Sequence, residues 1–359
     1  MRKNFVILLF LGVLLILLFS QNLTGMVKEQ EKKEQKPNII IIPDEVKKVF
    51  EEGMQTRQTR SDIPFSIVRY LYFPAGSNLY TIFFFRVKNA DLGFSPIADS
   101  PEEKKEKDEA LSATESPSAK LQAKSHFFLQ FNKLDNNTPG DVAYEVYVPV
   151  NVQEDSSTFE SEKVDYYSTG YPLAPGNYLL SMAICSQKLD KIGIQYLELS
   201  LPDMFSLGDK LETTPFFFVK TQEFMDSPEK RPTAHKGLFT YSILKIEPHF
   251  ENILSSGDNL ELLYYIFGAQ PAENGTFNIE VTYSILKGEE KAVSFAPGNY
   301  DTPFVNQPLP LKKTVVIKSE SGEQTEEQDI EAGKYTLSMK IIDKVSGKSV
   351  TKSVDFEVK

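Results

Sequence analysis

Residues 330–341 read Ile-Glu-Ala-Gly-Lys-Tyr-Thr-Leu-Ser-Met-Lys-Ile, and residues 173–184 read Leu-Ala-Pro-Gly-Asn-Tyr-Leu-Leu-Ser-Met-Ala-Ile. Both stretches place a glycine two residues before a tyrosine that begins an apolar run. Glycine permits the positive φ of a tight turn, and the tyrosine hydroxyl can then reach a backbone acceptor where the strand begins. This geometry is typical of the tyrosine corner of β-sandwiches. We therefore interpret Tyr178 and Tyr335 as structural residues, in preference to a ligand-binding role.

Strand patterns dominate the C-terminal part of the chain. Apolar residues take every second position of residues 277–285 and of residues 335–341, which is the period of a half-buried strand. Counting the other apolar segments, six or seven strand patterns fill residues 236–359, which is the size and spacing of an immunoglobulin-like sandwich. No convincing helix pattern interrupts them.

An internal repeat indicates two modules. Besides the repeated Gly-x-Tyr element, residues 140–146 resemble residues 275–281 in pattern. Apolar strands at 216–219 and 356–358 end the two halves. The charged, proline-bearing residues 223–235 between the halves give the best domain boundary.

The predicted fold is therefore all-β, with two tandem immunoglobulin-like or fibronectin-like β-sandwiches. Residues 38–222 form the first sandwich, residues 223–235 the linker and residues 236–359 the second sandwich. Within the first sandwich, residues 95–124 carry Ser-Pro pairs and an acidic run and lack any apolar period. We expect a disordered insertion there, and an ordered acidic binding loop is the alternative.

The N-terminal residues predict export. Arg2 and Lys3 precede an apolar run, so residues 1–25 are predicted to be a signal peptide or a membrane anchor. The run is shorter than the about 20 apolar residues of a spanning helix, which favours a cleaved signal. No small-x-small cleavage site follows, so an uncleaved anchor stays open. Residues 26–37 are expected to form a charged tether.

These features predict an exported protein that is periplasmic, at the cell surface or membrane-anchored, and that touches the membrane only through the N-terminal segment. The formal net charge of −11 repels phosphate backbones, so nucleic acid is not an expected partner. Cys185 is the only cysteine, which excludes an internal disulfide and a lipid-modified cysteine after the apolar run.

The sequence contains no pattern for catalysis, a cofactor or a metal. Gly-x-Ser-x-Gly, His-Glu-x-x-His and Walker-type motifs are absent, and the three histidines have no ligand spacing. His126 is expected at a strand start, His235 in the linker and His249 at a strand end, each as a surface or edge residue. Cys185 is expected to be a buried, inert thiol. We predict no catalytic, cofactor-binding or metal-binding residue, and a protein that is not an enzyme.

Two aromatic runs, residues 82–85 and residues 216–218, are apolar on both strand phases. Both faces of these strands must then be covered. A strand beneath the long insertion would cover the second face, and so would a contact between the sandwiches or with a partner.

The C-terminal stretch also resembles known modules. The Gly333–Met339 element is followed by Ile342-Asp343, by the turn Val345-Ser346-Gly347-Lys348-Ser349 and by Phe356-Glu357-Val358. This order resembles the immunoglobulin-like β-sandwich modules of bacterial exported proteins, in particular those accompanying GWxTD-type domains. The resemblance covers residues 237–359 and, to a lesser degree, the first domain. The Gly-Trp-x-Thr-Asp motif itself is absent because the chain has no tryptophan, so the resemblance implies a fold and a compartment but no activity.

Together these observations predict a non-enzymatic envelope protein that acts as a binding or scaffold module. Its loops or an exposed edge strand would meet a protein or glycan partner of the cell envelope. The alternative is a carboxylate-dependent glycan-active hydrolase, whose Asp and Glu residues meet only in the folded chain. Two carboxyl groups about 5 to 10 Å apart in an aromatic-lined cleft would favour that alternative.

Overall fold

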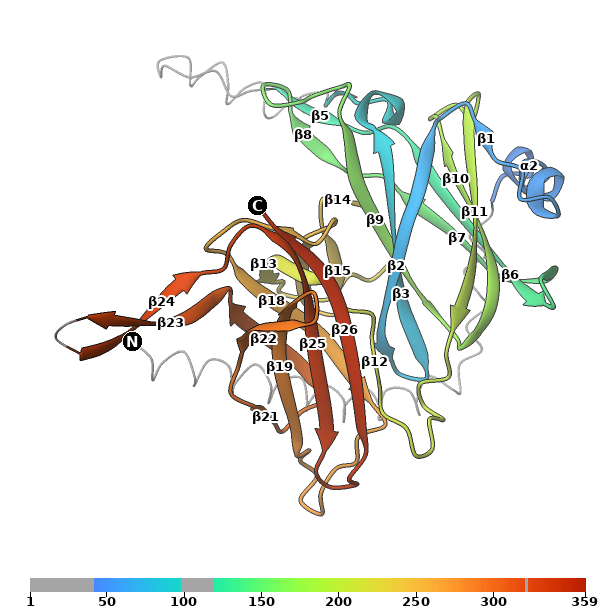
Figure 1. Cartoon of the computed structure of the whole chain (residues 1–359). Helices are drawn as coiled ribbons and strands as arrows, with labels where there is room; N and C mark the ends of the chain where they lie inside the picture. Colours follow the sequence, from blue (N-terminus) through green and yellow to red (C-terminus); the bar gives the residue numbers. More distant parts are fainter. Residues whose placement is uncertain (1–41, 98–118, 320–321) are drawn as a thin grey trace. The chain divides into compact units, whose positions relative to one another are not determined.

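In the residues that the structure describes, the regular structure is almost entirely β-strand (Figure 1). The computed structural model describes residues 42–97, 119–319 and 322–359, so the predicted leader and tether lie outside the described residues. In those ranges, no helix has the length and apolar content needed to cross a membrane. The strands build β-sandwiches, which confirms the predicted fold class.

Two antiparallel sheets form the first sandwich. One runs in the order β1-β11-β10-β6-β7 and the other in the order β14-β9-β3-β2. The first sheet consists of β1 (Arg60–Ser61), β11 (Ile192–Leu201), β10 (Gly176–Cys185), β6 (His126–Asp135) and β7 (Thr138–Pro149). The second consists of β14 (His235–Lys236), β9 (Val164–Leu173), β3 (Asn78–Lys88) and β2 (Phe65–Ala75). Side chains from both sheets, among them Phe83, Phe127 and Met182, form the core between them.

Two sheets also form the second sandwich. One sheet runs in the order β17-β26-β25-β19-β20, and β21 also pairs with β19. Its strands are β17 (Ile253–Leu254), β26 (Ser349–Val358), β25 (Gly333–Asp343), β19 (Ile279–Lys287), β20 (Glu290–Ser294) and β21 (Gly298–Tyr300). In the other sheet β18 pairs with β12, β13 and β22, and β13 also pairs with β16, which pairs with β15. Its strands are β12 (Glu212–Thr213), β13 (Phe218–Phe224), β15 (Phe239–Tyr241), β16 (Leu244–Pro248), β18 (Asn259–Phe267) and β22 (Phe304–Pro310).

A two-stranded hairpin lies between β22 and β25 in the chain. It consists of β23 (Lys312–Ser319) and β24 (Gly322–Asp329), which pair with each other. In Figure 1 it extends beyond the sheets of the second sandwich.

The strand order shows which parts of the two modules correspond. β10 lies between β11 and β6, and β25 lies between β26 and β19, so β6 corresponds to β19. The expected match of residues 140–146 with residues 275–281 is therefore wrong, because residues 140–146 belong to the edge strand β7. Alternation of apolar and polar residues reports which face is buried, but it does not report the place of a strand within its sheet.

Two short strands pair across the predicted domain boundary. β13 holds apolar residues that the sequence assigned to the end of the first sandwich, yet it pairs with β16 and β18 of the second. β14, at the end of the predicted linker, pairs with β9 of the first sandwich. The prediction that residues 216–219 close the first sandwich is therefore wrong. The predicted domain limits, 38–222 and 236–359, also do not coincide with the limits of the sheets. Segments that are neighbours in the sequence need not share a sheet.

A buried apolar cluster joins the two sandwiches. The junction cluster consists of Leu71, Phe73, Ile82, Phe84, Phe217, Val219, Phe239, Leu244, Ile246 and Leu263. Along β3, Ile82 and Phe84 face this cluster, whereas Phe83 and Phe85 face the core of the first sandwich. A contact between the sandwiches therefore covers the second face of the aromatic run 82–85, which is one of the alternatives that the sequence left open.

Helix α2 (Asp44–Met54) packs on the sheet that contains β10 and β11 (blue in Figure 1). Val46, Phe50 and Met54 are buried, and their four-residue spacing places them on one face of the helix. The cluster beneath the helix consists of Ile42, Val46, Phe50, Phe128, Ala183, Cys185, Ile192 and Ile194. This helix was not predicted from the sequence.

The predicted insertion is ordered at both ends. β4 (Ser95–Pro96) pairs with β5 (Lys120–Gln122), and β5 pairs with β8 (Gln153–Asp155). The expectation of disorder is wrong for these ends, because a short strand can be held by backbone hydrogen bonds that composition does not reveal. Residues 98–118 lie outside the described residues.

Candidate functional site

The two Gly-x-Tyr elements form the same corner in both sandwiches. The Tyr178 hydroxyl donates to the Ala174 carbonyl at 3.0 Å, and the Tyr335 hydroxyl donates to the Glu331 carbonyl at 2.7 Å. The glycines before them have φ values of 147° and 151°, a region that favours glycine. These contacts confirm that each tyrosine hydroxyl reaches a backbone acceptor where its strand begins.

The three histidines lie on separate elements. His126 begins β6, and its Nδ1 lies 3.0 Å from the Tyr147 hydroxyl. His235 lies in β14, with Nε2 3.2 Å from the Glu229 carboxylate, and His249 follows β16 in a partly buried position where burial lowers its pKa. Among the residues that the structure describes, no three His, Cys, Asp or Glu side chains form a group that could hold a metal ion.

Cys185 lies at the end of β10, fully buried beneath α2. Burial raises the pKa of its thiol to about 12, and the charge of Arg60 opposes this shift only in part. At neutral pH the group is a thiol and not the nucleophilic thiolate. The predicted burial of Cys185 is thus confirmed.

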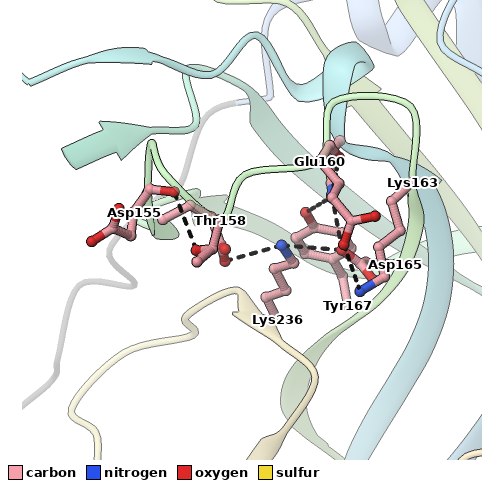
Figure 2. Close-up of polar contacts among 9 residues, drawn as sticks. Asp155, Thr158, Glu160, Lys163, Asp165, Tyr167 and Lys236 are labelled. Carbon is pink, nitrogen blue, oxygen red and sulfur yellow. Dashed lines mark hydrogen bonds and ion pairs between the residues drawn. The ribbon is translucent and has the colours of Figure 1, made fainter. Parts of the chain in front are cut away.

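A network of polar side chains lies where η1, β9 and β14 meet (Figure 2). The short helix η1 (Asn89–Leu92) brings the almost fully buried Asn89 to Asp165 and Tyr167 on β9. The Asn89 amide nitrogen donates to Asp165 Oδ2 at 2.8 Å and to the Glu160 carbonyl at 2.9 Å. The Tyr167 hydroxyl donates to Asn89 Oδ1 at 2.7 Å, so both ends of the Asn89 amide are engaged.

Lysine side chains complete this Asp165 network. Lys236 Nζ lies 3.1 Å from Asp165 Oδ2 and 3.0 Å from Glu154 Oε1, and Lys163 Nζ lies 3.3 Å from Asp165 Oδ1. Burial alone would raise the pKa of Asp165, but hydrogen bonds from Asn89 and Lys236 outweigh it, so the pKa is lowered. The network ties β14 to the first sandwich. Asn89 and Lys236 lie far from Asp165 in the sequence, so no local spacing could have revealed the network.

A surface hollow of about 760 Å³ lies beside β13, β16 and β18, within the volume range of small-molecule sites. The charged, histidine and aromatic residues of this carboxylate hollow are Glu247, Glu251, Asp258, Glu261, Lys220, His249 and Phe250. Its lining is net negative and contains a single aromatic ring.

Each carboxylate of the hollow also has a partner within the fold. Glu247 pairs with Lys220, and Glu251 accepts the Tyr166 hydroxyl. Asp258 accepts the Ser255 backbone N–H, and Glu261 accepts the Gln222 amide. The hollow is therefore lined by several acidic side chains, each of which is held by a partner within the fold. The hydrolase alternative called for an aromatic-lined cleft, whereas Phe250 supplies the single aromatic ring of this hollow.

Comparison with known proteins does not assign the chain to a family. No protein-family model matches the chain, and no curated protein matches it.

Proposed function

We propose that this chain is an exported envelope protein that acts as a non-enzymatic binding or scaffold module. The observation that carries the proposal is the way in which the sandwiches are joined. β13 pairs within the second sandwich, β14 returns to the first, and the junction cluster buries aromatic side chains of both. A large apolar contact of this kind opposes relative motion of two domains. Loops and edge strands of both sandwiches would then be presented at a fixed spacing, as a scaffold requires.

The free edge of β7 is the best-placed surface for a partner strand. In the described chain β7 pairs with β6 and ends its sheet. An edge strand presents unpaired N–H and C=O groups to which an extended segment of another protein can add. Val142 on β7 is 48% exposed, an unusual position for an apolar side chain. We therefore place the protein partner of the module at this edge.

Site-specific photo-crosslinking in cells tests the proposal. A photoreactive residue replaces Val142 in the full chain, and a matched one replaces Val345, which is 41% exposed in the turn between β25 and β26. We expect one reproducible adduct from position 142 and none from position 345. Equal adducts from both positions would contradict a specific edge, and the absence of any partner along β7 would contradict the binding module.

The carboxylate hollow favours a second candidate, the glycan-active hydrolase. Purified full chain is incubated with envelope glycan, and new reducing ends are measured. Glu247→Gln and Asp258→Asn change the hollow, whereas Glu326→Gln changes an exposed residue of β24 outside it. Turnover that both hollow variants abolish and the control retains would replace the scaffold proposal with an enzymatic one.

A further inference from the structure

Two arginines lie side by side on the face of the first sandwich that meets the second. Arg69 on β2 is opposite Phe84 on β3, and Arg86 is two residues further along β3, opposite Tyr166 on β9. Because alternate residues of a strand share a face, Arg86 continues the face on which Phe84 contributes to the junction cluster. A residue and its diagonal neighbour on the next strand lie within reach of long side chains. The two guanidinium groups therefore belong to one patch.

Aromatic rings surround this arginine pair. The Arg69 guanidinium carbon lies 5.7 Å from the centre of the Phe84 ring, and that of Arg86 lies 5.1 Å from the centre of the Tyr166 ring. Tyr166 stacks on Phe250 with ring centres 4.1 Å apart and planes 7° apart. Phe250 also meets Phe84 edge-on at 5.6 Å. The rings hold both guanidinium groups in place but supply no hydrogen-bond acceptor to their N–H groups.

Neither arginine has an acidic partner among the residues that the structure describes. Nε and Nη2 of Arg69 are buried and have no hydrogen-bond acceptor there, and burial lowers the pKa of this guanidinium. Arg86 is exposed, and its guanidinium lies over the Tyr166 ring. By contrast, Arg57 pairs with Glu198 at 2.9 Å. A buried cationic N–H without an acceptor is costly, so an unsatisfied group of this kind calls for a bound water or ion.

One carboxylate lies at the rim of the patch. Glu251 Oε1 accepts the Tyr166 hydroxyl at 3.0 Å, and no ion pair joins Glu251 to either arginine in the part of the chain that the structure describes. The formal charge of the two arginines and Glu251 is +2 − 1 = +1, in a chain whose net charge is −11. Phe250 and Glu251 also line the carboxylate hollow, whose net-negative lining would repel a polyanion, so a single small anionic group fits the patch better.

We propose that Arg69 and Arg86 form a subsite for an oxyanion, the carboxylate, sulfate or phosphate group of a ligand. Guanidinium forks match the planar spacing of two oxygens and bind them with charge-assisted hydrogen bonds. An anion between the two groups also removes the repulsion of like charges and supplies an acceptor to Arg69, which a water does only in part. The anion would reach the subsite from the exposed side of Arg86 and would contact the partly buried Arg69 on its inner side. The subsite does not depend on the proposed function.

Anion-dependent thermal unfolding of the full chain tests the subsite. Sodium malonate, sulfate and phosphate are titrated against sodium chloride at equal ionic strength. We expect a saturable rise in unfolding temperature with at least one of them, and the tightest of the three identifies the ligand group. Arg86→Gln should weaken that anion at least about tenfold, the loss expected for a charge-assisted hydrogen bond. Arg57→Gln, which removes an arginine with an acidic partner, should bind the anion like the unaltered chain.

Arg86 gives the decisive variant because it is exposed, whereas replacing Arg69 also changes packing. Arg69→Gln should weaken the same anion as Arg86→Gln does. Sulfate and phosphate stabilise many proteins without binding a site, but that effect does not saturate and does not need Arg86. An equal response of the unaltered chain and Arg86→Gln, or the absence of saturation with all three anions, would overturn the proposal.

Discussion

At the scale of single residues, Arg69 is partly buried, and its Nε and Nη2 groups have no acceptor among the described residues. A methionine would fill similar space beside Phe84 without a charge. Because replacing buried charge by apolar side chains often stabilises proteins, we expect Arg69→Met to raise the free energy of unfolding by roughly 1–4 kcal/mol. Urea unfolding in chloride buffer measures this, with Arg57→Met as the control that breaks an ion pair. Destabilisation by Arg69→Met would show that the guanidinium has a partner in solution.

The tyrosine corners permit a matched comparison between the two sandwiches. Tyr178→Phe and Tyr335→Phe each remove one hydrogen bond to a backbone carbonyl and should each cost about 0.5–1.5 kcal/mol. The corresponding alanine variants also remove a buried ring, so about 3–5 kcal/mol is expected. Because the two corners are separate, the effects of the Phe variants should add in the double variant. A Phe variant as damaging as its Ala variant would show that the hydroxyl, and not the ring, dominates the corner.

The Asp165 network predicts a specific dependence of stability on pH. The pKa of Asp165 is lower in the folded chain than its ordinary value, because its hydrogen bonds outweigh burial. Its contribution is therefore present above the unfolded pKa, about 4, and is lost as the pH falls through the folded pKa. Asp165→Asn should lower stability at pH 7 and flatten its decline in acid, as measured by urea midpoints at several pH values. Glu162→Gln, at an exposed ion pair with Lys88, should leave the acid decline unchanged.

At the scale of elements, α2 shields the single cysteine of the chain. Phe50 and Cys185 share the cluster beneath the helix, and both are fully buried. Phe50→Ala should cost about 3–5 kcal/mol and increase opening of α2. The rate at which a thiol reagent modifies Cys185 at neutral pH should therefore rise. Glu51→Ala, at an exposed position of the same helix, should leave that rate unchanged. An unaltered rate in Phe50→Ala would show that Cys185 is reached by another route.

Particular elements also show how much of the fold could be predicted from the sequence. The tyrosine corners were predictable because each hydroxyl finds its acceptor four residues earlier in the chain. The pairing of β13 was not, because β16 and β18 come later and apolar strands do not encode their neighbours. Helix α2 had a usable signal in the spacing of Val46 and Phe50.

The candidate sites were less predictable than the strands. The Asp165 network includes Asn89 and Lys236, which lie far from Asp165 in the sequence. The arginine pair lies on the consecutive strands β2 and β3, where an irregular register decides which side chains share a face. Their charged residues follow no motif that would distinguish them from solvated surface groups. At the junction, the sequence did predict that both faces of residues 82–85 are buried, because apolar residues occupy both strand phases there.

At the scale of the whole molecule, the second sandwich depends on residues that precede its predicted start. Fragment 209–359 contains β12 and β13, whereas fragment 236–359 lacks both. Without them β18 loses two strand partners, and the core loses Phe218. We expect fragment 209–359 to unfold cooperatively and at a clearly higher urea concentration than fragment 236–359. Equal midpoints in circular dichroism would mean that β13 adds little to the second sandwich.

The pairing of β13 and β14 also has a consequence for how the chain is made. The first sandwich is synthesised before the residues that cover Ile82 and Phe84, because the junction cluster includes residues as late in the sequence as Leu263. During that interval the nascent chain exposes an aromatic strip, and β9 has not yet gained β14. Such a surface favours aggregation and attracts chaperones, and it closes only when the second sandwich has emerged. Biogenesis of this protein is therefore most vulnerable midway, when one sandwich is complete and the other is still being synthesised.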